Sequence, residues 1–164
     1  MSSRVETIAL VCALCVTACA TVAPEIKDDQ SGQYITIKGP SDGRLPLGGP
    51  TSVWSIWSAV NKTGYRVSHK LYVAITYRDI WRSYESAVDD TSKSLPVTTL
   101  DKRTLLLMEK AERISIDLDD GTLRARAKTG YPVTISARSG HSMSITVTPE
   151  QIDLQTAAVD KYAK

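Results

Sequence analysis

Short runs of alternating apolar and polar residues recur along the chain and predict β-strands. Tyr34–Lys38 alternates over its whole length, and so does Ile114–Leu118. Residues 70–78 place four large side chains on one face of a strand: Leu71, Val73, Ile75 and Tyr77. A second strand is predicted over 53–60, and the turn-forming residues Asn61 to Gly64 separate it from the first. We expect this pair to form the centre of a sheet.

Three segments have weaker patterns. Residues 80–88 fit a helical stripe through Trp81, Tyr84 and Val88, but their aromatic and β-branched content favours a strand. Residues 95–100 and 104–108 are short apolar runs. Gly39 to Pro50 is rich in glycine and proline, which predicts a loop that is either functional or disordered, with Leu45 and Leu47 as its apolar residues.

The last third of the chain predicts a hairpin and two short helices. Residues 132–137 and 143–147 alternate on either side of Ser139-Gly140, which is typical of a hairpin. Asp119 is a candidate N-cap of a first helix with Gly130 beyond its end, and Thr148-Pro149-Glu150-Gln151 is a helix start whose helix packs Ile152, Thr156 and Val159. The expected class is mainly β, an antiparallel sheet or β-sandwich with two short C-terminal helices.

All three cysteines lie near the N-terminus, at positions 12, 15 and 19. A Cys-x-x-Cys pair can hold zinc, but Cys12 and Cys15 lie in an apolar run with no second pair and no nearby histidine, so we expect no metal site. Arg4 precedes the apolar segment Ile8–Val16, and small residues follow it. This segment is too short to cross a bilayer, and its order of zones is typical of a removable export signal.

Val16-Thr17-Ala18-Cys19 resembles the lipobox of bacterial lipoprotein precursors, in which a small residue precedes the cysteine that becomes the N-terminus. The resemblance implies that Cys19 is acylated and that its chains hold the protein on a membrane, whereas bulky Leu14 disqualifies Cys15. In Gram-negative lipoproteins an Asp after the cysteine favours the inner membrane. Here Ala20 follows, which implies the periplasmic face of the outer membrane. A plain secretory signal cut after Ala20 is the alternative.

These features divide the chain into three parts: a lipoprotein signal peptide at 1–18, a tether at 19–33 and a single β-rich periplasmic domain at 34–164. Residues 19–33 are polar and interrupted by Pro24 and Gly32, which is typical of a flexible linker. The mature domain contains no cysteine for a bridge and depends on its core alone. We find no internal repeat.

The charge and the motifs exclude several classes of function. The net charge is +2 with interspersed signs, which does not favour nucleic acid as a partner. No hydrolase, metalloprotease or phosphate-loop motif occurs, and Asp117 to Gly121 lacks the spacing of a calcium loop. His69 and His141 are expected at the surface, and no pattern places either beside Asp89 or Asp90. We therefore expect a non-enzymatic protein without a cofactor.

Aromatic residues are concentrated between positions 54 and 84, and they give the candidate ligand-binding residues: Trp54, Trp57, Trp81 and Tyr84. On a regular strand Trp54 and Trp57 project from opposite faces, so one can be buried while the other is exposed. An exposed tryptophan can bind a glycan or a partner chain. The simpler interpretation is that a chain without phenylalanine fills its core with Tyr and Trp.

Residues 70–140, with the runs LYVAITYRDIWRSYESA and TLRARAKTGYPVTISARSG, also resemble small bacterial lipoproteins without an assigned activity. This resemblance carries over no functional residue. The leading hypothesis is a membrane-anchored, periplasmic binding or assembly module that contacts another envelope protein. The alternative is a lipoprotein that binds glycan or peptidoglycan through exposed aromatic residues.

Overall fold

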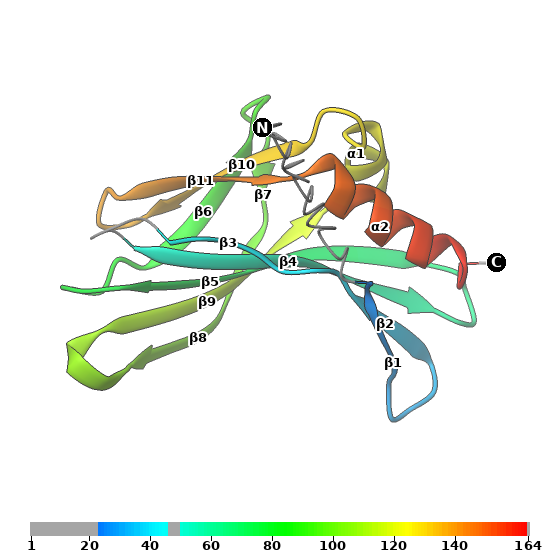
Figure 1. Cartoon of the computed structure of the whole chain (residues 1–164), viewed down its shortest axis with the longest axis horizontal. Coiled ribbons are helices and arrows are strands. Elements are labelled where there is room, and N and C mark those ends of the chain that lie inside the picture. The colour runs from blue at the N-terminus through cyan, green and yellow to red at the C-terminus, as the bar shows by residue number, and fades with distance from the viewer. Residues whose placement is uncertain (1–22, 46–49, 164) are drawn as a thin grey trace, which may run out of the picture.

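The computed structural model describes residues 23–45 and 50–163, which form two antiparallel sheets and two α-helices (Figure 1). The larger sheet is ordered β1 (Glu25–Asp28), β2 (Tyr34–Lys38), β4 (Thr51–Asn61), β5 (Val67–Tyr77), β9 (Lys110–Leu118) and β8 (Val97–Thr104), and β3 (Asp42–Arg44) also pairs with β4. The smaller sheet is ordered β11 (Ser142–Val147), β10 (Tyr131–Ala137), β6 (Tyr84–Asp89) and β7 (Ser94–Leu95). The helices are α1 (Asp120–Ala125) and α2 (Pro149–Asp160), with a 3-10 turn, η1, at Leu106–Met108. The mainly β class with two late helices is confirmed.

The central strands bury one face because their side chains alternate. β4 and β5 pair so that Trp54 lies opposite Val73 and Ile56 opposite Leu71, and all four side chains are buried. The four residues predicted on one face of residues 70–78 are all buried. Burying a side chain of this size stabilises the fold by roughly 1.5–3 kcal/mol, so this alternation fixes the register of the sheet.

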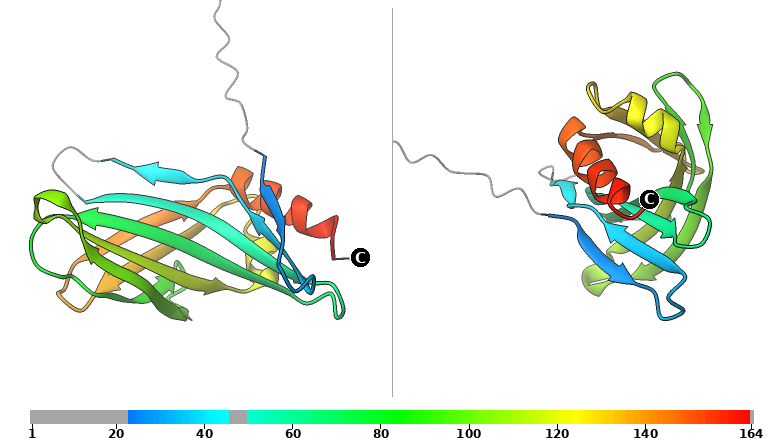
Figure 2. Two further views of the ribbon diagram at one scale, coloured as in Figure 1. Left: turned by 90° about the horizontal axis from the view of Figure 1, so that it is seen from below. Right: turned by 90° about the vertical axis from the view of Figure 1, so that its right-hand side faces the viewer.

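The two sheets face each other across one apolar core (Figure 2). The main cluster joins Ile75 and Ile116 of the larger sheet with Val133 and Ile135 of the smaller one, and α1 adds Leu123. A second cluster lies under α2, where Val159 packs with residues of β2 and β4. Both helices therefore cover the same face of the larger sheet that packs on the smaller sheet, and its other face is the outer face of the fold.

The two helix starts are as predicted. The Asp119 side chain accepts a hydrogen bond from the Thr122 amide at 2.8 Å and caps α1. Thr148 and Gln151 form a reciprocal capping box at α2, with Pro149 in the first turn. Ile152, Thr156 and Val159 are buried. The local signals succeed here because a cap satisfies backbone amides that nothing else in the helix can satisfy.

The predicted tether, residues 19–33, contains a strand that the sequence pattern did not predict. Residues 19–22 lie outside the described residues, as does the lipobox. Residues 25–28, expected to be flexible, form β1, which pairs with β2 from Glu25 opposite Lys38 to Asp28 opposite Ile35. The turn between them is closed by the Asp29 side chain, which accepts from the Tyr34 amide at 3.1 Å and from the Ser31 hydroxyl at 2.5 Å. The folded part therefore begins before residue 34.

The two ambiguous segments are also settled in part. Within the glycine- and proline-rich loop, residues 42–44 form β3, while residues 46–49 lie outside the described residues. The preference for strand over helix at 80–88 is confirmed for Tyr84 onward, where β6 begins. Residues 78–83 form an irregular crossover between the two sheets, in which Asp79 and Ser83 have positive φ.

Candidate functional site

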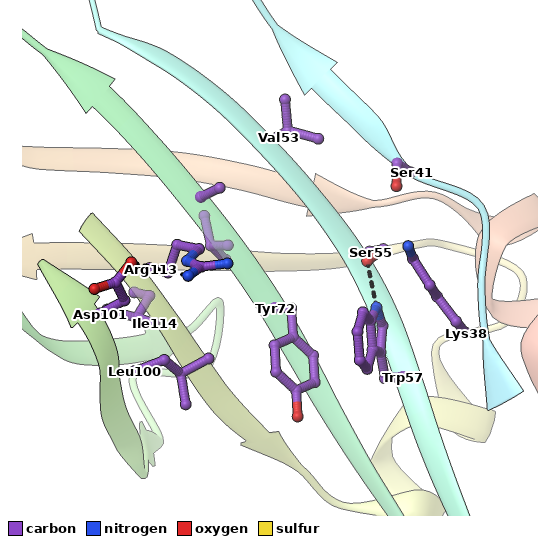
Figure 3. A pocket seen from close by; sticks show the side chains of 12 residues that line it. Lys38, Ser41, Val53, Ser55, Trp57, Tyr72, Leu100, Asp101, Arg113 and Ile114 are labelled. Atoms are coloured by element: carbon purple, nitrogen blue, oxygen red, sulfur yellow. Dashed lines mark hydrogen bonds and ion pairs between the residues drawn. The ribbon is translucent and has the colours of Figure 1, made fainter. Parts of the chain in front are cut away.

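A pocket of about 380 Å³ lies on the outer face of the larger sheet (Figure 3). It is formed by strands β2, β4, β5, β8 and β9 and by the segment after β2. We call it the Trp57 trough, and its lining residues are Lys38, Ser41, Val53, Ser55, Trp57, Tyr72, Val73, Ala74, Leu100, Asp101, Arg113 and Ile114. The small side chain of Ala74 lies opposite Val53 on β4 and Arg113 on β9, and it leaves room between larger neighbours.

The aromatic wall of the trough is held on several sides. The ring centroids of Trp57 and Tyr72 are 4.4 Å apart with an interplanar angle of 36°. The Trp57 indole N–H donates to Ser55 Oγ at 2.8 Å, and the Lys38 ammonium lies 5.2 Å from the indole centroid. A cation and an aromatic neighbour at these distances stabilise one ring position. The wall is therefore preorganised for a ligand.

Charges of both signs line the trough. At one side Arg113 Nη2 donates to Asp101 Oδ2 at 2.8 Å, and Arg103 lies 3.1 Å from the same oxygen. The hydrogen bond from Arg113 is the main reason that the pKa of Asp101 lies below its ordinary value. Lys38 stands at the other side, and among the described residues it has no carboxylate within ion-pair distance. The trough thus offers donors, an acceptor and an aromatic surface.

The structure does not bring the four candidate aromatic residues together. Trp54 and Tyr84 are 8% and 1% exposed and belong to the core, so they form no exposed platform. Trp57 lies in the trough on the opposite face of β4 from Trp54, as strand alternation predicted. Trp81 is 38% exposed and lies on the crossover, where Lys110 sits 5.1 Å from its ring centroid.

Sequence reasoning missed the partners of Trp57. Tyr72 is its diagonal neighbour on β5, because Ser55 pairs with Tyr72 and Trp57 with Lys70. Lys38 lies directly opposite Trp57 on β2. Parity along β5 assigns Tyr72 to the face opposite Leu71, and that signal was present. The strand register that joins these residues was not readable from the pattern.

A second arrangement, in the core, was also missed. Ser58 Oγ lies 2.6 Å from His69 Nδ1, and His69 Nε2 lies 2.8 Å from Asp120 Oδ1. The Asp120 carboxylate only accepts, so the imidazole donates to it from Nε2, and Nδ1 of the neutral ring accepts from the Ser58 hydroxyl. The oxygen of that hydroxyl accepts from Gln155 Nε2 at 2.7 Å. Burial lowers the pKa of His69, although Asp120 opposes this, and the ring is neutral at neutral pH. The expectation that His69 is a surface residue was wrong.

This Ser-His-Asp chain has the composition of a hydrolase triad, but its surroundings are those of a structural network. Ser58 is 1% exposed and its hydroxyl faces the core, so a substrate carbonyl has no route to it in this structure. The network continues outward from Asp120 through Arg124 to Asp160, with bonds of 2.9 and 2.8 Å. It therefore links β4 and β5 to both helices.

Comparison with known proteins adds no family. No protein-family model, no curated protein and no solved structure matches the chain. Within residues 23–45 and 50–163, no cluster of His, Cys, Asp and Glu side chains could hold a metal ion. In the same part of the chain, none of the helices has the length and hydropathy needed to span a membrane.

Proposed function

We propose that this protein is a lipid-anchored, non-enzymatic binding module of the bacterial cell envelope, with the Trp57 trough as its ligand site. The proposed location is the periplasmic face of the outer membrane. The anchor rests on the resemblance of Val16 to Cys19 to a lipobox. The binding role rests on one observation, the preorganised Trp57–Tyr72 pair in a pocket on the outer face of the sheet.

The chemistry of the trough favours a carbohydrate strand such as the glycan of peptidoglycan. Aromatic rings offer flat apolar area for the C–H face of a sugar, and a binding site adds a few placed polar groups that fix its orientation. Lys38 and Arg113 are donors for sugar hydroxyls or carboxylates, and Asp101 is an acceptor.

The edges of the larger sheet favour a ligand on its face over a partner that adds a strand. β1 has only four residues, and β8 carries an irregularity between Thr99 and Asp101 followed by charged Lys102 and Arg103. Short edges, irregular registers and charges oppose pairing with a further strand. The outer face around Trp57 has no such obstacle.

The anchor is tested with a Cys19→Ala chain and metabolic labelling by a fatty acid. We expect the label to be lost and the protein to leave the membrane fraction. An unmodified N-terminus at Thr21 in the mass of the natural product contradicts the anchor, and the localisation with it.

The ligand site is tested with Trp57→Ala and Tyr72→Ala chains, measured by titration with soluble peptidoglycan fragments. We expect each change to weaken binding by at least about tenfold, or ~1.4 kcal/mol, because aromatic anchors dominate such interfaces. Trp81→Ala is the matched control, since it removes an exposed indole outside the trough and leaves the affinity unchanged. Equal losses in all three chains, or no binding by the wild type, refute the assignment.

A further inference from the structure

One end of the fold carries a group of large apolar side chains in solvent. They lie on the crossover 78–83 and on the connection 104–110 between β8 and β9, which we call together the loop end (Figure 1). Its exposed apolar residues are Ile80 (74%), Trp81 (38%), Leu105 (38%), Leu106 (89%) and Met108 (74%). Two contacts hold the two segments side by side: Arg78 Nε to Glu109 Oε1 at 3.4 Å, and Lys110 to the Trp81 ring.

The backbone of the loop end is unusual. Asp79, Ser83 and Met108 have φ values of +94°, +58° and +64°. Residues other than glycine adopt such conformations at an energetic cost, and they persist where the surroundings impose them, often at functional positions. Here the buried Glu112 carboxylate accepts the Ser83 amide at 2.9 Å and shapes the crossover. The loop end thus presents exposed apolar side chains on a backbone that a buried carboxylate helps to shape.

The loop end carries a small excess of positive charge, with Arg78, Arg82 and Lys110 against Asp79 and Glu109. Lys110 lies beside the Trp81 ring, whereas Arg82 stacks on the ring of Tyr77 at 4.5 Å, and among the described residues neither cation has a carboxylate within ion-pair distance. Arg78 is matched by Glu109, and among the described residues Asp79 has no cation within ion-pair distance. An indole beside a cation, with exposed apolar side chains near it, is typical of surfaces that enter lipid headgroups.

We propose that the loop end inserts into the headgroup region of an anionic lipid bilayer, as a second membrane contact beside the acylated Cys19. The apolar side chains of Leu106, Met108 and Ile80 enter the boundary of the acyl chains. Trp81 lies at headgroup level, and Lys110 binds a lipid phosphate. This inference rests on the proposed anchor for its location, but the surface chemistry that carries it is independent of acylation.

The position of β1 constrains how both contacts meet one bilayer. In Figure 1, β1 and the loop end lie toward opposite ends of the long axis, so both reach the membrane when this axis lies along its surface. From Cys19 to Glu25, where pairing with β2 begins, the chain spans at most about 20 Å. A domain held that close to a bilayer meets the lipid surface at a high effective concentration, so a weak contact is sufficient. Two membrane signals together give stable, oriented binding where one apolar contact alone is marginal.

The test uses the chain purified as the cell produces it, mixed with vesicles of phosphatidylglycerol and phosphatidylcholine whose acyl chains carry bromine. Bromine quenches tryptophan fluorescence at short range, and the signal of Trp81 is the part that a Trp81→Tyr chain lacks. We expect Trp81 to be quenched. In a Leu106→Ser/Met108→Ser chain the quenching is lost, and any binding that does not depend on acylation falls by at least about tenfold.

Tyr65→Ser is the matched control, because it removes an exposed large side chain (54%) from the turn between β4 and β5 and leaves the quenching unchanged. Unquenched Trp81 in a chain whose mass shows acylated Cys19 overturns the inference and leaves the anchor standing. An unmodified N-terminus together with quenched Trp81 overturns the anchor and supports the lipid contact. Protection of Trp81 by a protein from the same membrane, without lipid quenching, assigns the surface to a protein partner instead.

Discussion

Replacing Glu112 tests whether one buried carboxylate holds the crossover between the two sheets. Its side chain is fully buried on β9. It accepts the Tyr77 hydroxyl and the amides of Ser83 and Tyr84, the last two at 2.9 and 3.2 Å, and Lys102 Nζ lies 3.6 Å away. Burial acts to raise the pKa of Glu112, but these hydrogen bonds outweigh it and the pKa lies below its ordinary value. The group is therefore a carboxylate at neutral pH.

The decrease in the free energy of unfolding on replacing Glu112 follows from the donors that lose their acceptor. In Glu112→Ala, two amides and one hydroxyl lose their acceptor, and breaking such a buried charged network costs about 3–5 kcal/mol. In Glu112→Gln, the amide oxygen still accepts the Tyr77 hydroxyl and the Ser83 amide, while the NH₂ group faces the Tyr84 N–H. We expect this chain to lose about 1–3 kcal/mol, the cost of one unsatisfied buried group.

Urea unfolding followed by circular dichroism measures both values. Glu85→Gln is the control, because the ion pair of Glu85 with Arg138 is solvent-exposed and contributes less than about 1 kcal/mol. The reasoning is refuted if Glu112→Ala unfolds within about 1 kcal/mol of the wild type, or if the alanine chain is as stable as the glutamine chain.

Three further changes probe the core and the helices. Because burial depresses the pKa of His69, the unfolded chain takes up a proton near pH 6.5 before the folded chain does. The free energy of unfolding therefore decreases as pH falls below about 6.5, by at most ~1.4 kcal/mol per pH unit. A His69→Gln chain whose free energy of unfolding has the same slope between pH 6.5 and 5 contradicts this. Gly39→Ala places a Cβ 2.5 Å from Gln155 Oε1 and 2.9 Å from the Ile56 carbonyl oxygen. We expect the free energy of unfolding, measured with urea, to decrease by about 1–3 kcal/mol. An unchanged value would show that the neighbouring atoms shift to make room. Thr148→Ala removes the cap of α2 and lowers stability by about 1 kcal/mol, whereas Thr148→Ser keeps it.

The local elements were predictable because each depends on residues close in sequence. Strand alternation located β2, β4, β5 and β9, and the Thr148 capping signal located α2. β1 was missed because Glu25 to Asp28 contains a single apolar residue, Ile26, so no alternating apolar pattern marks the strand. Its order comes from pairing with β2 and from the Asp29 turn, which are contacts that a hydrophobic pattern does not report.

The candidate site was only partly predictable. Parity separated Trp54 from Trp57, but the trough also needs Lys38 and Arg113 from strands on either side, and their positions depend on register. The buried network needs His69 and Asp120, which are 51 residues apart. Composition favours a surface position for a lone histidine. Only the fold shows that Ser58 and Gln155 satisfy this one.

The placement of β1 at the sheet margin has a mechanical consequence. On the proposed anchor, any pull between membrane and domain is applied at Glu25, to a four-residue strand whose residues are all exposed. Such a strand is the first element to detach under load. Its detachment releases the segment up to Tyr34 and lengthens the tether by roughly 30 Å, while both core clusters stay intact. The molecule would then yield in steps, lengthening before it unfolds.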